Sequence, residues 1–129
     1  INKKIKRREN FRPFAPSILK EYQKDWFRET YDNFYMSSVM RVKENKKNFI
    51  PAVVHVDGSS RVQSVKEENN LKFYQLIKKF YNKINIPMLL NTSFNENEPI
   101  VRRPQEAIEC LLRTKMDSLF IDKFYVEKK

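Results

Sequence analysis

The chain has 129 residues and a mass of 15.7 kDa, which is the size of one ordinary domain and leaves no room for two large independent cores. Apolar residues make up 40% and aromatic residues 13%, so the composition disfavours intrinsic disorder. The 26 Lys and Arg outnumber the 16 Asp and Glu, and the formal charge of +10 predicts attraction to phosphates, nucleotides, nucleic acid, an acidic protein or a membrane surface.

Several classes of protein are disfavoured by simple features of the sequence. The longest apolar stretches, such as 88–90, are too short to span a bilayer, so no membrane partner is expected. Cys110 and His55 are the only residues of their types, which excludes an internal disulfide and disfavours a zinc site built from them. One cysteine and no apolar signal segment favour a cytoplasmic location, and a start at Ile1 favours a piece of a longer polypeptide.

The first third of the chain is predicted to contain one helix and one strand. Segment 1–16 is strongly basic, and Pro13 and Pro16 are expected to prevent a regular helix there. Residues 17–27 show apolar side chains at helical spacing, with Ser17 as the N-cap. The alternation over 34–42 predicts a strand.

The middle of the chain predicts two strands joined by a tight turn. Residues 50–56 form a β-branched run, and strand character resumes over 61–65. Between them, 57–60 has turn composition and contains Gly58, the only glycine. We therefore expect Gly58 to adopt a positive φ or to allow a close approach of the backbone.

The last part of the chain predicts two helices and two strands. A helix is expected to follow Asn69 or Asn70 as its cap, and a second helix begins at Pro104. Strands are predicted over 87–90 and 119–126. The first helix has an apolar stripe of Leu71, Tyr74, Ile77, Tyr81 and Ile84, and the second is expected to bury Ala107, Ile108, Leu111 and Leu112. The mixed order predicts the α/β (α+β) class, a single domain with a twisted mixed β-sheet flanked by helices.

Three clusters of polar residues are candidates for chemistry, and the first is basic. Lys6, Arg8 and Arg12 are interleaved with Phe11 and Phe14 and can converge on a polyphosphate, since Arg offers a planar fork of donors and Lys a mobile charge. The alternative is a solvated basic surface.

The second cluster surrounds the predicted tight turn. Backbone N–H groups there and Arg61 can hold an anion, while Asp57 orients the arginine or a metal-bound phosphate. His55 precedes the turn, in a position where structural histidines are common. An ordinary hairpin turn is the alternative.

The third cluster is the run Asn91, Thr92, Ser93 and Asn95, directly after a predicted buried strand. Ligands in open α/β sheets bind beyond the carboxyl ends of strands, and amides and hydroxyls bind nucleotides without adding charge. The alternative is a loop that satisfies its own backbone groups. Cys110 lies on a predicted amphipathic helix and is interpreted as a packing residue.

Taken together and in this order, the motifs resemble a known family. The segments 6–16, 55–63, 91–95, 98–101 and 114–119 are similar to the carboxy-terminal domain of the O-carbamoyltransferases, which include the NodU-type nodulation and antibiotic-tailoring enzymes. The resemblance covers essentially the whole chain, so residues 1–129 are interpreted as part of that domain.

The resemblance implies a YrdC-like fold that binds ATP, with Mg²⁺, and carbamoyl phosphate, and forms carbamoyl-adenylate with loss of pyrophosphate and phosphate. An actin-like, metal-binding amino-terminal domain, the implied partner, then transfers the carbamoyl group to a small-molecule hydroxyl acceptor. The resemblance makes Lys6, Arg8, Arg12 and Arg61 the catalytic cations. It gives the contacts with nucleotide and phosphate to Asn91, Thr92, Ser93, Asn95, Asp57 and His55, and no metal ligands to this chain.

Two parts of the family pattern lie outside this sequence, namely a glycine-rich block upstream of the basic motif and the metal-binding half. We therefore expect the chain alone to lack transferase activity. Two other functions remain open: a basic nucleic-acid-binding module, whose affinity falls steeply with salt, and a non-catalytic domain that docks on its partner.

Overall fold

The computed structural model describes residues 1–7, 9 and 11–128, and only the backbone of Lys4. Its contacts divide the chain into two compact units. Unit 1 combines Ile1–Arg12 with Ser93–Lys129, and unit 2 is Pro13–Thr92. No helix in the described part of the chain is both long and apolar enough to cross a membrane.

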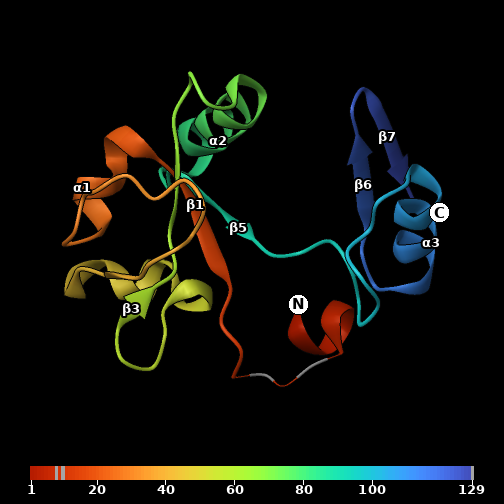
Figure 1. Cartoon of the computed structure of the whole chain (residues 1–129), viewed down its shortest axis with the longest axis horizontal. Coiled ribbons are helices and arrows are strands. Elements are labelled where there is room, and N and C mark those ends of the chain that lie inside the picture. Colours follow the sequence, from red (N-terminus) through yellow and green to blue (C-terminus); the bar gives the residue numbers. More distant parts are fainter. Residues whose placement is uncertain (8, 10, 129) are drawn as a thin grey trace. The chain divides into compact units, whose positions relative to one another are not determined.

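Unit 2 is built on a three-stranded mixed sheet in the order β4-β1-β5. The central strand, β1 (Ala15–Leu19), runs parallel to β4 (Gln63–Val65) and antiparallel to β5 (Met88–Asn91). Figure 1 shows β1 and β5 side by side with α2 (Leu71–Ile84) packed near them. The mixed α/β class predicted from the sequence is confirmed, and the YrdC-like topology stays a prediction.

Both faces of this sheet are buried. On one face, Leu19 and Val65 pack against Ile77 of α2. On the other, Ile18 and Met88 join a larger cluster that contains Phe27. The predicted helix after Asn70 is confirmed, with the Asn70 side chain accepting a hydrogen bond from the Phe73 N–H at 3.1 Å.

The helix predicted over 17–27 is wrong. Ser17 lies inside β1. Within 17–27, the helical residues are those of η2 (Lys20–Tyr22) and α1 (Gln23–Trp26). Because β1 is buried on both faces, its residues do not alternate between apolar and polar, and a short apolar run of this kind is easily taken for a helix.

The strand predicted over 34–42 shrinks to β2 (Met40–Arg41). Asn33 explains the difference, because its Oδ1 accepts from the Ser37 N–H and its Nδ2 donates to the Ser38 carbonyl, both at 2.9 Å. These bonds stabilise a loop in place of a strand ladder.

The strand predicted over 50–56 is also wrong. The chain forms the 3₁₀ helix η4 (Pro51–Val53) there, directly after another 3₁₀ helix, η3 (Glu44–Phe49). Pro51 favours this outcome since it starts a helical turn and supplies no N–H to a ladder. The turn predicted over 57–60 is confirmed only in its first half: it ends at Gly58, with φ 79°, and Ser59 and Ser60 form β3 (Ser59–Ser60), which pairs with β2.

Unit 1 combines η1 (Asn2–Lys6), a turn of π-helix, with α3 (Pro104–Arg113), β6 (Ser118–Ile121) and β7 (Phe124–Glu127). Figure 1 shows β6 and β7 as an antiparallel hairpin beside α3. A small core is made by Ala107, Leu111 and Leu119.

Two expectations for unit 1 are wrong. The single strand predicted over 119–126 is a hairpin that turns at Asp122, which has a φ of 49°. Ile108 and Leu112 are exposed because α3 packs only through the side that carries Ala107 and Leu111. Cys110 is buried, as the packing interpretation requires.

The N-cap of α2 provides a test of the fold. Replacing Asn70 with Ala removes the acceptor for the Phe73 N–H, and we expect a loss of about 1 kcal/mol in the free energy of unfolding, measured in urea. The matched control is Asn69→Ala at the neighbouring exposed position, which should change stability much less. Equal losses in both variants would contradict the capping role.

Candidate functional site

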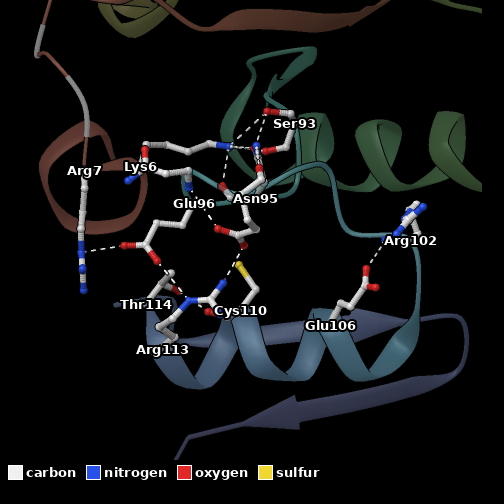
Figure 2. Close-up of polar contacts among 12 residues, drawn as sticks. Lys6, Arg7, Ser93, Asn95, Glu96, Arg102, Glu106, Cys110, Arg113 and Thr114 are labelled. Atoms are coloured by element: carbon white, nitrogen blue, oxygen red, sulfur yellow. Dashed lines mark hydrogen bonds and ion pairs between the residues drawn. The ribbon is translucent and has the colours of Figure 1, made fainter.

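A buried lysine joins two of the predicted site residues in unit 1. Lys6, at the end of η1, is only 3% exposed, and its ammonium group contacts four oxygens of Ser93 and Asn95. It donates to the Ser93 carbonyl, to Ser93 Oγ at 3.3 Å, and to the carbonyl and Oδ1 of Asn95 at 2.7 and 2.8 Å (Figure 2). These oxygens carry no formal charge, and they replace water around the ammonium.

The Asn95 amide is fixed in one orientation. Its Oδ1 accepts from Ser93 Oγ at 2.6 Å as well as from Lys6, and its Nδ2 donates to the Glu98 carbonyl at 2.7 Å. Ser93 itself is exposed. The Ser93 hydroxyl donates its one hydrogen to Asn95 Oδ1, so the cluster places an exposed serine beside a buried ammonium, with their polar atoms bonded to one another.

An ion-pair network adjoins this cluster (Figure 2). The side chain of Glu96 is 7% exposed and pairs through Oε1 with Arg7 Nε at 2.7 Å and through Oε2 with Arg113 Nε at 3.1 Å. Arg113 Nη2 also donates to Glu98 Oε1 at 2.6 Å. The contact between Arg7 Nε and Glu96 Oε1 is an ion pair but not a hydrogen bond, because the N–H group does not point at the oxygen.

The network shifts the pKa values of its members in the directions expected for paired charges. The hydrogen bond to Glu96 raises the pKa of the Arg113 guanidinium. Backbone N–H groups, first that of Glu98 itself, lower the pKa of the Glu98 carboxyl, and the charge of Arg113 adds to the effect. Burial raises the pKa of the Cys110 thiol, which keeps it protonated and fits a packing role.

Arg12, the other described cation of the first predicted cluster, makes a different contact. Arg12 is exposed and pairs with Glu9 at 3.1 Å. Arg8 lies outside the described residues. Of the interleaved aromatics, Phe11 is exposed and Phe14 is buried in the core of unit 2.

The predicted turn cluster is ordered by its own serine. Asp57 Oδ1 accepts from the backbone N–H and Oγ of Ser59 at 2.9 and 2.7 Å, and these bonds lower the pKa of Asp57. His55 Nδ1 lies 3.0 Å from Ser59 Oγ. Arg61 is exposed. A side chain at Gly58 would begin 2.7 Å from Lys47 Nζ, so this glycine satisfies both a positive φ and a close approach.

Asn91 belongs to a polar group on the sheet of unit 2. Its Nδ2 donates to Ser17 Oγ at 3.0 Å and to Gln63 Oε1 at 2.8 Å, and Ser17 Oγ donates to Gln63 Oε1 at 2.6 Å. The amide thus links all three strands. Thr92, the next residue, is exposed.

Comparisons with known proteins assign the chain to a family. The family described as Carbamoyltransferase C-terminus matches residues 1–128. The chain belongs to this family. Its relatives include the nodulation protein NolO of Bradyrhizobium diazoefficiens, 41% identical over 133 residues, which cover 100% of this chain and 24% of that protein.

Other relatives of this carbamoyltransferase-family chain have the same pattern of coverage. The nodulation protein NolNO of Sinorhizobium fredii is 39% identical over all of the chain and 20% of its own length. The 3'-hydroxymethylcephem-O-carbamoyltransferase of Amycolatopsis lactamdurans is 35% identical over 94% of the chain and 23% of its own length. The chain thus spans about a quarter or less of these proteins.

Three residues of the unit 1 cluster were not anticipated from the sequence: Arg7, Glu96 and Arg113. Glu96 directly follows Asn95, and its place beside the polar run 91–95 is the one local signal that could have pointed to it. Arg113 is 17 positions away from Glu96, and no local pattern connects them.

The Asp57 carboxyl provides a test of the turn cluster. Ser59→Ala removes the hydroxyl donor, and we expect the pKa of Asp57 to rise toward its ordinary value, measured by NMR titration of the side-chain carboxyl. Since the folded-state pKa is depressed, the Ser59 hydroxyl stabilises the fold above the ordinary Asp range, and its contribution is lost as the pH falls through the folded value.

The control is Ser60→Ala, because the Ser60 hydroxyl donates to the Val53 carbonyl at 2.7 Å and not to Asp57. This variant should leave the pKa of Asp57 unchanged. The assignment would be refuted by an Asp57 pKa that is the same in Ser59→Ala as in the wild type.

Proposed function

We propose that the chain is the part of an O-carbamoyltransferase that binds ATP, with Mg²⁺, and carbamoyl phosphate and forms carbamoyl-adenylate. Its membership of the carbamoyltransferase family supports a transferase role. The observation that carries the finer proposal is the contact of the buried Lys6 ammonium with Ser93 and Asn95.

The chemistry of this cluster suits adenylate formation. Cleavage of carbamoyl phosphate by water gives carbamate and phosphate. A carbamate oxygen then attacks the α-phosphorus of ATP and pyrophosphate leaves, while fixed cations stabilise the negative charge on the phosphoryl oxygens without a nucleophilic side chain. In this proposal Lys6 supplies such a cation, and the exposed Ser93 hydroxyl rotates from Asn95 Oδ1 to a nucleotide or phosphate oxygen. Asn95 presents its amide in a fixed orientation.

Residues of unit 2 have separate roles in the proposal. Arg61 is exposed and holds a phosphate or the carbamoyl portion, with Asp57 and His55 ordering the turn before it. Asn91 and Thr92 contact the nucleotide. In unit 1, Arg8 and Arg12 neutralise phosphates. An amino-terminal domain receives the adenylate and binds the hydroxyl acceptor, in keeping with the much greater length of the relatives.

Calorimetric titration with Mg-ATP, and separately with carbamoyl phosphate, tests the proposal. We expect saturable ATP binding by the chain. Lys6→Met should weaken it about tenfold or more, since a charge-assisted hydrogen bond to phosphate is worth about 1.5–3 kcal/mol. Ser93→Ala and Arg61→Ala should also weaken ATP binding. Lys3→Met is the matched control, because Lys3 lies on the same turn of helix and is exposed.

Salt and nucleotide selectivity complete the test. A nucleotide pocket should prefer ATP over other triphosphates and lose affinity modestly when the salt concentration is raised. Absence of ATP binding in a folded wild-type sample would contradict the proposal. Tight binding of RNA or single-stranded DNA with a steep salt dependence would instead support the nucleic-acid-binding alternative.

A further inference from the structure

The carboxylate of Glu96 has no part in the chemistry described above, although it is almost completely buried beside the residues that do. We propose that Glu96 is a positioning residue that holds the turn 93–98 against Lys6. The inference rests on the proposed function for the identity of the ligand, and on the geometry of unit 1 for everything else.

Glu96 ties together three parts of unit 1. Through Arg7 it reaches the residue that follows Lys6, and through Arg113 it reaches the last residue of α3. It also directly follows Asn95 in the chain. Glu96 is thus the sequence neighbour of Asn95, and its carboxylate pairs with Arg7, the sequence neighbour of Lys6. The contact between Lys6 and Asn95 forms the candidate site.

Arg113 extends the constraint to the far side of the turn. Its guanidinium contacts Glu96 and Glu98 through different nitrogens, which a planar fork of donors allows. The Glu98 carbonyl in turn accepts from the Asn95 amide. Behind the turn, the Val101 N–H donates to the Phe94 carbonyl at 2.9 Å, and both side chains pack on the core of unit 1.

Burial makes this arrangement sensitive to the removal of one charge. A carboxylate that is 7% exposed is stable only while its partners remain in place, and removing it leaves Arg7 and Arg113 without the group that orders them. Of its two ion pairs with Arg113 of α3, the turn then keeps the one made by Glu98, and the Asn95 amide and the Ser93 hydroxyl are held less firmly over Lys6.

A purely electrostatic role gives the opposite sign for ligand binding. If Glu96 merely offset positive charge beside a phosphate site, Glu96→Gln would remove a repulsion and tighten ATP binding. If Glu96 positions the turn, the same variant weakens ATP binding in spite of the more favourable charge. The direction of the change in affinity therefore separates the two roles.

The experiment compares wild type with Glu96→Gln by calorimetric titration with Mg-ATP and by hydrogen exchange of the Val101 amide without ligand. We expect ATP affinity to fall about fivefold or more and Val101 exchange to become faster. Glu109→Gln is the matched control, since it removes the same charge from an exposed position on α3. It should leave both measurements unchanged or make ATP binding slightly tighter.

A second, conservative variant distinguishes loss of the proposed contacts from unfolding of the protein. Arg113→Lys keeps the positive charge but cannot bridge Glu96 and Glu98 with a planar fork, and it should change both measurements in the same direction as Glu96→Gln. Equal or tighter ATP binding by folded Glu96→Gln would overturn the inference, and so would weaker binding with unchanged Val101 exchange. Failure of the wild type to bind ATP overturns the proposed function, and Val101 exchange then still decides whether Glu96 holds the turn.

Discussion

A charge can be buried only if other groups replace its water, and this constraint organises unit 1. The Lys6 ammonium is surrounded by oxygens of Ser93 and Asn95, which fixes the turn that carries them. Next to it, Glu96 is buried between two arginines. Each charge determines where a different chain segment must lie, so η1, the turn and α3 are held together by polar contacts as much as by the small core of Ala107, Leu111 and Leu119.

In unit 2, the polar side chains within the sheet are neutral and are stabilised by hydrogen bonds to one another. Asn91, Ser17 and Gln63 exchange hydrogen bonds across β5, β1 and β4, so polar side chains lie within a sheet without unsatisfied donors. The turn at Gly58 is ordered in a similar local way by Ser59. Two of the sequence motifs that indicate the family therefore have clear structural roles, and binding roles for the same residues remain proposals.

Elements whose signals are local were predictable from the sequence. The Asn70 cap and Pro104 marked the starts of α2 and α3, and a short apolar run marked β5. Elements determined by distant contacts were not. β1 was mistaken for a helix because its burial on two faces comes from partners elsewhere in the chain, and the β6–β7 hairpin was merged into one strand because Asp122 turns without glycine.

The candidate site likewise contains residues that the sequence indicates and contacts that only the fold determines. The family resemblance assigned Lys6, Ser93 and Asn95 each to ligand binding, but their contact with one another was not predicted, since 87 positions separate Lys6 from Ser93. Arg12 is exposed, in agreement with the solvated basic surface given as the alternative for its cluster, and Arg61 is exposed as well. The contacts of Arg7 and Arg113 with Glu96 depend on the fold of unit 1, and nothing in the local sequence encodes them.

The central position of β1 has a consequence for how unit 2 acquires its structure. Ser17 bonds to Gln63, 46 positions later, and accepts from Asn91, 74 positions later. Closing such long loops costs chain entropy before the contacts can compensate, so folding of this sheet is expected to be slow compared with that of α2. On the ribosome, β1 leaves the exit tunnel well before either of its partner strands, and its apolar residues need protection from other chains until β5 has been synthesised.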